Sequence, residues 1–227
     1  MKTTPNRFLT AVALALALLS SAKAGLINGG FESPNYGPGT NSYPVTIPGW
    51  QTTDRTFEIW GSGFFGVPAY EGIQFAELNA YIAGTLFQDV AGITAGSRVG
   101  FQFAHRGREG VDTMNFLLTD LGINGIVGGG DDTVLFTKNY SDGTSAWGFY
   151  DASAESAIYS LGNMVRFSYT AVVSVGGASF GNFLDAADFG VGVGGVPTNS
   201  VPDTASTLAL LGSAILGLAA LRRRFVA

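Results

Sequence analysis

The chain of 227 residues contains no cysteine, a single histidine and only 13% charged residues. Without cysteine there can be no disulfide framework, no thiolate metal site and no lipid attached through a cysteine. The single histidine, His105, excludes a histidine-rich metal site and leaves any Ser-His-Asp hydrolase dependent on that residue alone. Stability must therefore come from packing, and a metal held by oxygen ligands is the one cross-link that remains available.

Positive charge is also scarce between the two ends of the chain. Residues 25–200 contain sixteen Asp and Glu against six Lys and Arg, a net charge of −10. An acidic surface of this kind does not attract nucleic acid or anionic lipid, so nucleic acid is excluded as a partner. The remaining Lys and Arg residues lie at the two ends, where targeting signals need them.

The first 24 residues have the pattern of a secretory signal peptide. Lys2 and Arg7 form a positive region, residues 8–19 are apolar except for one threonine, and Ala22 and Ala24 supply the small residues of a cleavage site. We expect signal peptidase to cleave after Ala24, which exports the protein. An uncleaved anchor helix is the alternative, although the apolar run is shorter than the ~20 residues that a spanning helix needs.

The end of the chain combines a short apolar segment with an arginine cluster. Residues 207–221 would form a helix about 22 Å long at ~1.5 Å per residue, against a hydrocarbon core of ~30 Å. Arginine side chains can extend to the headgroup layer and, by the positive-inside rule, hold the C-terminus in the cytoplasm. We therefore predict a membrane stop formed by Arg222, Arg223 and Arg224.

A short motif precedes this segment and consists of Val201, Pro202, Asp203, Thr204, Ala205 and Ser206. The order of motif, apolar helix and arginines in residues 201–227 resembles the C-terminal sorting signals of the PEP-CTERM class, in particular the variant that begins Val-Pro-Asp-Ser-Gly. The resemblance implies cleavage by a membrane-embedded exosortase and transfer to the cell envelope or extracellular matrix. Ala205 stands where the variant has glycine, and a plain tail anchor is the alternative. The uncharged, Gly- and Val-rich residues 191–200 predict a flexible linker.

The residues between the two signals, 25–190, predict one all-β domain. The chain has 33 glycines, many beside aromatic or β-branched residues, which favours short strands joined by turns. Residues 165–175 and 99–105 alternate apolar and polar side chains, and residues 110–119 can return beside 99–105 as a hairpin. Further short apolar runs occupy residues 84–90, 133–137 and 180–189. We expect a jelly-roll β-sandwich between an N-terminal signal peptide and a short C-terminal transmembrane helix.

Three phrases of this domain are distinctive: the opening Asn28-Gly-Gly-Phe-Glu32, the segment Pro48-Gly-Trp50 and the closing residues 181–189 (GNFLDAADF). They resemble galactose-binding-like jelly-roll domains and the related carbohydrate-binding modules. In those modules a first-strand glutamate and a last-strand aspartate often meet at a structural calcium ion. The resemblance therefore implies calcium bound by Glu32 and Asp185, with two solvated strand-end acids as the alternative.

Aromatic residues could stack on sugar rings, although in a small sandwich they are more often core residues. The resemblance favours carbohydrate binding by the glycine-rich segment from Trp60 to Tyr70, with Glu71 and Arg106 as polar groups. The rival interpretation is that these rings cover the core. His105 follows two phenylalanines on one strand face, and we interpret it as a hydrogen-bonded residue at the edge of the core.

Three functions remain open at this point. The first is binding of a neutral or basic polysaccharide by a non-catalytic exported protein, and the second is a structural matrix protein without a discrete ligand. The third, a glycoside hydrolase, would need two carboxylates at a set separation, and Glu58, Glu71, Glu77 and Asp112 are candidates by residue type alone. Apart from calcium, we expect no cofactor.

Overall fold

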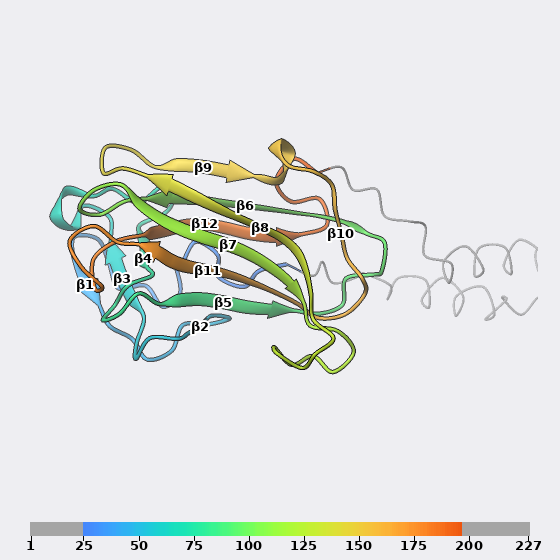
Figure 1. Cartoon of the computed structure of the whole chain (residues 1–227). Coiled ribbons are helices and arrows are strands. Elements are labelled where there is room, and N and C mark those ends of the chain that lie inside the picture. The colour runs from blue at the N-terminus through green and yellow to red at the C-terminus, as the bar shows by residue number, and fades with distance from the viewer. Residues whose placement is uncertain (1–24, 197–227) are drawn as a thin grey trace, which may run out of the picture.

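The computed structural model describes residues 25–196, which form two antiparallel β-sheets packed face to face (Figure 1). The first sheet has the spatial order β1 (Asn41–Ser42), β3 (Glu58–Gly61), β4 (Gln74–Glu77), β12 (Phe183–Gly190) and β6 (Arg98–Arg106), with β9 (Gly148–Asp151) and β10 (Ile158–Tyr159) both paired to β6. The second sheet has the order β2 (Gln51–Thr52), β5 (Thr85–Val90), β11 (Val165–Val173), β7 (Asp112–Asp120) and β8 (Thr133–Asp142).

This architecture confirms the predicted all-β sandwich. Within residues 25–196 the helical segments are two three-residue 3₁₀ turns, η1 (Phe64–Gly66) and η2 (Ala152–Ala154). No helix in this part of the chain is long and apolar enough to cross a bilayer. The predicted signal peptide, with Ala22 and Ala24, and the predicted sorting segment, with its arginine cluster, lie outside the described residues.

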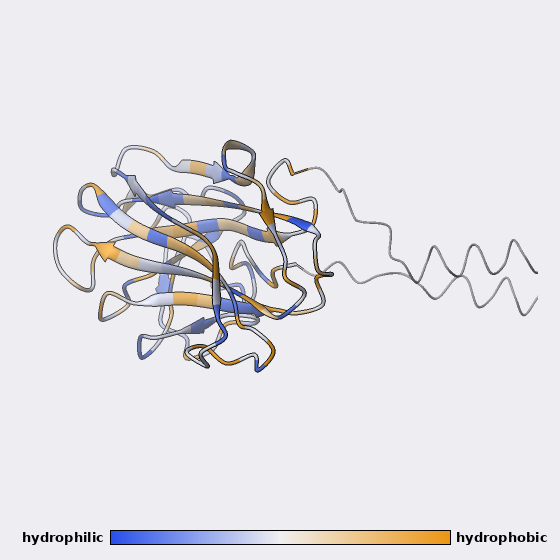
Figure 2. Ribbon diagram, turned by 45° about the vertical axis from the view of Figure 1, so that its right-hand side comes forward, coloured by the Kyte–Doolittle hydropathy of each residue, from blue (hydrophilic) through white to orange (hydrophobic). Residues whose placement is uncertain are grey.

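Alternation of side chains along the strands builds the core between the sheets. In β11, Val165, Phe167 and Tyr169 are fully buried, whereas Arg166 and Thr170 lie on the other face. Figure 2 shows the same alternation as hydrophobic and hydrophilic bands along the strands. Each large apolar side chain buried in this way contributes roughly 1.5–3 kcal/mol to folding. The rings of the core include those of Phe31, Trp50, Phe101, Phe103, Phe116, Phe167, Tyr169 and Phe189.

One strand pairing differs from the prediction. Residues 99–105 and 110–119 do form strands, β6 and β7, but they belong to different sheets and the loop between them crosses the sandwich. The hairpin prediction is wrong because both edges of β6 are occupied, by β12 on one side and by β9 and β10 on the other. Alternation determines which face of a strand is buried, and it does not select the neighbouring strand.

The domain extends beyond its predicted boundary at residue 190. Val196 is only 4% exposed and belongs to the core, and its amide donates to the carbonyl of Val193 at 3.2 Å. The first six residues of the predicted linker, 191–196, therefore belong to the domain. The domain extends to residue 196 because burying the apolar side chain of Val196 in the core is favourable compared with leaving it in water.

The two ends of the sandwich carry different loops. At one end, called here the pocket end, β6 and β11 finish and β7 and β12 begin, so that loops 107–111 and 174–182 lie together. At the other, called here the exit end, β7 finishes, β11 begins, and the described chain leaves the domain at Val196. Hydrogen bonds from Leu121 to Met164 and from Ser160 to Ser97 join the loops there.

Candidate functional site

The loop of residues 62–73 folds back over the outer face of the first sheet. Trp60, Phe75 and Phe183 project from three strands of this face and are at most 1% exposed. The loop covers them with Phe64 and Val67, and the Phe64 ring meets Trp60 edge to face at 4.8 Å. A second apolar cluster outside the sandwich thus fixes the position of the loop.

Two carboxylates also hold this loop, by accepting hydrogen bonds from its backbone. Asp185 Oδ2 accepts from the amides of Tyr70 and Glu71 at 2.9 and 3.1 Å. Glu32 Oε1 accepts from the amides of residues 73 and 74 at 2.9 and 3.1 Å. Asp185 precedes a bulge in β12, where Ala186 has a φ of 51° and the register with β6 shifts. Burial, although opposed by these amides, raises the pKa of Asp185 to about 7.

Arg108 reaches the same outer face from loop 107–111. Its Nη1 donates to both carboxylate oxygens of Glu77, at 3.1 and 3.0 Å, and its backbone amide donates to Asp112 Oδ2 at 2.8 Å. The guanidinium carbon lies 4.7 Å from the ring centroid of Trp60 and 4.4 Å from that of Phe180. Ion pairing and two aromatic faces therefore hold the guanidinium in one orientation.

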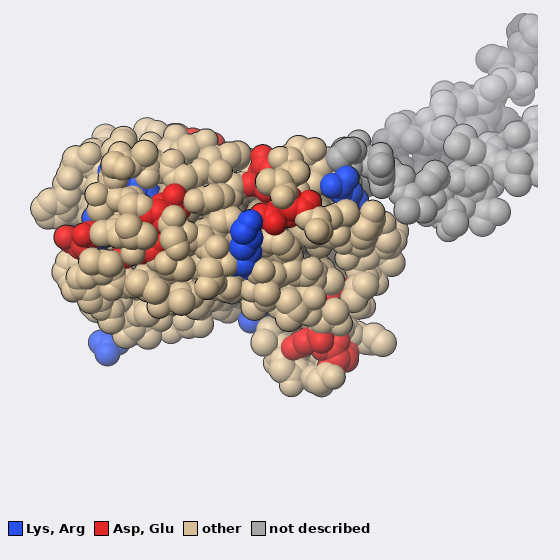
Figure 3. Space-filling model, turned by 45° about the horizontal axis from the view of Figure 1, so that its top comes forward, with Lys and Arg blue, Asp and Glu red and all other residues tan. Residues whose placement is uncertain are grey.

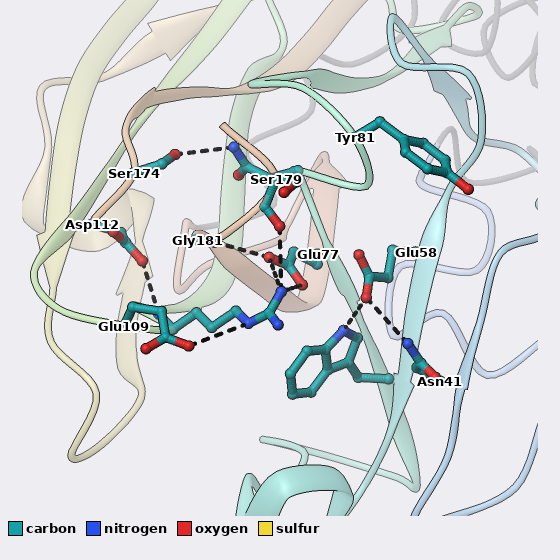
Figure 4. A network of polar contacts seen from close by, with 12 residues as sticks. Asn41, Glu58, Glu77, Tyr81, Glu109, Asp112, Ser174, Ser179 and Gly181 are labelled. Carbon is teal, nitrogen blue, oxygen red and sulfur yellow. Dashed lines mark hydrogen bonds and ion pairs between the residues drawn. The ribbon is translucent and has the colours of Figure 1, made fainter. Parts of the chain in front are cut away.

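Behind Arg108 lies a pair of buried carboxylates. Glu58 and Glu77 are directly opposite each other on β3 and β4, and Figure 4 shows them side by side, with Asn41 beside Glu58 and Gly181 beside Glu77. They are 2% and 1% exposed. Burial and the Glu58 carboxylate raise the pKa of Glu77 well above its ordinary value, although Arg108 and the Gly181 amide oppose the shift.

Glu58 has donors of its own. Its Oε1 accepts from the indole of Trp60 at 2.8 Å and from the hydroxyl of Tyr43 at 2.9 Å. Burial and the hydrogen bond to Glu58 raise the pKa of Tyr43 to about 12, so this hydroxyl stays a donor across the physiological range. Glu58 is thus an acceptor that fixes the indole, and Glu77 is the acceptor that fixes Arg108.

A pocket of about 360 Å³ opens above Arg108. It is lined by Trp60, Phe65, Val67, Arg108, Glu109 and Phe180. Phe65 is 81% exposed and has a φ of 46°, a left-handed conformation that a phenylalanine rarely adopts. Gly63 and Gly66, which flank the pair Phe64 and Phe65, also have positive φ values. The turn therefore holds one ring in solvent at the rim of the pocket, and strain of this kind is typical of functional positions.

The accessible groups of the pocket suit binding. Glu109 is half exposed at its side chain, and its Oε1 lies 3.9 Å from Arg108 Nε. The buried pair Glu58 and Glu77 would have to be reached by substrate and water to act as general acid and base. Both are covered by the site's own side chains and carry bound donors. The arrangement places a fixed guanidinium and a carboxylate among aromatic rings.

The predicted ligand residues differ in their exposure and in their partners. Trp60 is 1% exposed, because Phe64 and Arg108 cover its ring, and this corrects the expectation of an exposed stacking surface there. Tyr70 is 42% exposed and stacks on Phe149, with ring centroids 5.6 Å apart and an interplanar angle of 8°. Arg106 donates through Nη2 to the carbonyl of Thr144.

Glu71 lies near the predicted metal ligands. Its charge contributes to the raised pKa of Asp185, and its amide is bound by that carboxylate. Within residues 25–196, no group of three or more His, Asp or Glu side chains is placed to hold a metal ion. Glu32 and Asp185 both bind the 70–74 backbone, so each already has a structural role. Calcium binding by these two residues stays a prediction.

The single histidine is a satisfied core residue, as predicted. His105 is fully buried, with Nδ1 2.7 Å from Asp142 Oδ2 and Nε2 3.0 Å from Asn182 Oδ1. The Tyr150 hydroxyl donates to the same Asp142 carboxylate at 2.9 Å. This network joins the two sheets close to the pocket end, and no serine nucleophile forms part of these contacts.

Sequence reasoning missed the residues that build the pocket. Arg108 is held mainly by Glu77, which is 31 residues away in the sequence. Phe180 comes from a third loop, 174–182, and Glu109 follows Arg108 in loop 107–111. The run Gly-Ser-Gly-Phe-Phe-Gly around Phe65 was the available signal, because closely spaced glycines permit a turn that exposes a ring.

Comparison with known proteins identifies the C-terminal signal. Residues 200–225 match the VPDSG-CTERM motif, and a sorting motif of this class implies export and membrane anchoring. The matched range contains the predicted motif and Arg222–Arg224, all outside the described residues. The comparison with curated proteins found no match.

Solved structures with a similar sandwich were also found. One is TmCBM61 in complex with beta-1,4-galactotriose, at 17% identity and a TM-score of 0.43, covering 74% of this chain and 98% of that one. Another is the C-terminal family 22 carbohydrate-binding module of Clostridium thermocellum Xyn10B, at 14% identity and 0.43, covering 75% and 99%. A third is the K2 adhesin domain of Lys-gingipain, at 15% identity and 0.43, covering 70% and 95%. At these identities and TM-scores the likeness carries no inference about a ligand or an activity.

Proposed function

We propose that this protein is an exported, surface-sorted carbohydrate-binding protein, and that the pocket above Arg108 is its binding site. The observation that carries the proposal is the guanidinium of Arg108, fixed between two aromatic rings at the base of a 360 Å³ pocket. Sites for small polar ligands combine aromatic walls with a few fixed polar groups. Here the walls are Phe65 and Phe180, and the polar groups are Arg108 and Glu109.

The charges around the pocket favour a neutral sugar. Arg108 is already paired with Glu77 and lies near Glu109, so the site has no excess positive charge for an anionic glycan. Figure 3 shows that most of the surface in its view is uncharged, with acidic and basic residues in small separate groups. Hydroxyl groups can instead accept from the guanidinium edge and donate to the Glu109 carboxylate.

The exposed ring of Phe65 supplies the apolar contact. The Phe65 ring contacts Phe64 and Trp60, with ring centroids 4.5 and 6.0 Å away, and these contacts restrict its motion before a ligand binds, which lowers the entropic cost of binding. One face of a pyranose ring carries C–H groups and can lie against such a ring. Phe180 forms part of the same wall from loop 174–182.

The C-terminal signal supports a location of this binding activity at the cell envelope. The VPDSG-CTERM match supports processing of residues 200–225 by an exosortase-type membrane protease after export. A binding domain released or transferred at that point would meet envelope or extracellular polysaccharide. The proposal of a carbohydrate ligand and the proposal of an exosortase are independent of each other.

A glycan array probed with the domain, followed by titration of three variants, tests the proposal. Phe65→Ala should weaken binding about tenfold or more, equivalent to roughly 1.4 kcal/mol, without loss of stability because the ring is 81% exposed. Arg108→Lys keeps the charge but not the planar donor set, and it should also weaken binding. Phe149→Ala removes an exposed ring outside the pocket and should leave affinity unchanged.

Other outcomes would contradict the proposal in different ways. If Phe149→Ala weakens binding while Phe65→Ala does not, the glycan lies on the Tyr70–Phe149 stack and the pocket is not the site. If the array retains no glycan, the carbohydrate function fails. A structural matrix protein would then be the better interpretation, and the burial of Trp50 and Trp60, at 5% and 1% exposed, favours that second function.

A further inference from the structure

Loop 121–132, between β7 and β8, displays apolar side chains to solvent. Ile123 is 95% exposed, Ile126 is 64% exposed and Val127 is 50% exposed. Isoleucine at 95% exposure has almost no contact with its own domain. Clusters of exposed apolar residues on a soluble surface commonly mark contact with a protein or a membrane.

Hydrogen bonds within this loop hold its apolar residues outward. Asp131 Oδ2 accepts from the amides of Ile123 and Asn124, at 2.9 and 3.4 Å. Asn124 Oδ1 accepts from the amide of Ile126 at 2.7 Å, and Asp132 Oδ2 accepts from Gly128 at 2.6 Å. The polar side chains are therefore used within the loop, and the branched apolar side chains form its outer surface.

The loop lies at the exit end of the domain. Asp120, its last preceding strand residue, pairs with Val165, and the amide of Leu121 donates to Met164. Figure 1 shows the loop as a projection below the end of β5 and the start of β11, at the end of the sandwich where the described chain finishes. Val196 is the last described residue there.

Only ten residues, 197–206, separate this point from the apolar segment 207–221. Fully extended, ten residues span at most about 35 Å. The exit end of the domain must therefore stay within about 35 Å of the membrane while the C-terminal segment is inserted. If the ten residues are less than fully extended, the exit end lies closer.

We propose that loop 121–132 contacts the phospholipid surface while the protein is held by its C-terminal segment, so that Ile123, Ile126 and Val127 enter the interface. The contact is apolar, because the loop carries Asp131 and Asp132 and no basic residue. A zwitterionic lipid surface fits these features, whereas an anionic one would repel the two carboxylates. The proposal does not depend on carbohydrate binding.

The absence of cysteine makes a site-specific test direct. In the full-length protein, Ile126→Cys is labelled with an environment-sensitive nitrobenzoxadiazole dye and reconstituted into phosphatidylcholine vesicles. The control is Val111→Cys, which replaces an apolar residue of similar exposure, 61% against 64% for Ile126, in the loop at the pocket end. Flotation of both labelled proteins with the vesicles confirms that the chain is membrane-bound.

The dye at residue 126 should shift its emission to shorter wavelength, gain intensity severalfold and be quenched by lipids that carry a nitroxide on the acyl chain. The dye at residue 111 should show none of these changes, and raising the salt concentration should not reverse them at 126. Equal, water-like emission at both positions overturns the proposal, as does failure to float. A shift at 126 that grows with protein concentration without vesicles overturns it in favour of contact between copies.

Discussion

Asp185 should make the stability of the domain depend on pH in an unusual direction. Most aspartates in folded proteins are more acidic than in the unfolded chain, and their contribution to stability is lost as pH falls. Asp185 is fully buried, and burial raises its pKa to about 7 from an ordinary value of 3.8. The folded state therefore binds the proton of Asp185 more tightly than the unfolded chain does. The stability that this proton contributes is fully present below about pH 4 and is lost as the pH rises through about 7.

The size of the effect follows from the pKa shift. A difference of about 3 pKa units, at 1.36 kcal/mol per unit, corresponds to roughly 4 kcal/mol of unfolding free energy lost between pH 4 and pH 8. Three amides already bind the carboxylate, those of Tyr70, Glu71 and Ala186, and the negative charge of Glu71 adds to the cost of ionisation. The loss is a large fraction of the stability of a domain of this size.

Urea unfolding of residues 25–196 in chelator, from pH 4 to pH 8, measures this loss. Asp185→Asn keeps the shape of the side chain but cannot ionise. The unfolding free energy of the wild type should therefore drop between pH 4 and pH 8 by about 4 kcal/mol more than that of the variant. The variant also loses one acceptor for an amide, which costs about 1–3 kcal/mol at every pH and does not change the slope. Glu77 titrates in both proteins and cancels in the comparison. Parallel curves for the two proteins would refute the reasoning.

Two further predictions concern calcium and processing. If calcium binds Glu32 and Asp185, saturation at ~100 times its dissociation constant should add about 2.7 kcal/mol of stability at pH 8. Glu32→Gln should abolish this gain, and identical melting curves in calcium and chelator would disprove the site. The mature protein should lack residues 1–24 and, in a host with a matching exosortase, the arginine cluster as well. The intact mass of the surface-located form measures both losses. If Arg222–Arg224 are retained, the segment is a plain tail anchor.

Strands could be predicted from the sequence because their side chains alternate over many residues. The pattern of 165–175 predicts β11, and the apolar run 180–189 predicts β12. Alternation is a local property, so it could not show that β12 lies between β4 and β6 or that β7 joins the other sheet. The bulge at Ala186 was also invisible, because a left-handed alanine has no sequence signature.

The candidate site could be predicted only in part. The glycine-rich segment before Tyr70 predicted the loop that carries Phe65, but two adjacent phenylalanines give no indication of which one faces solvent. Backbone geometry decides: Phe64 packs on Trp60, and the positive φ of Phe65 turns the next ring outward. Arg108 could not be assigned, because Glu77 comes from a strand far away in sequence.

The two proposed surfaces lie at opposite ends of one rigid sandwich, and this separation has a physical consequence. β6 runs from the exit end to the pocket end over nine residues, or about 30 Å at ~3.3 Å per residue. This distance exceeds the Debye length of about 8 Å at physiological salt, so lipid headgroup charge would not affect a sugar in the pocket. The pocket is open and one of its walls is an exposed ring, which favours modest affinity at each site. If many copies are anchored by their exit ends, their pockets all face away from the membrane. A polysaccharide that contacts several pockets at once is then bound with a higher overall affinity than one pocket provides.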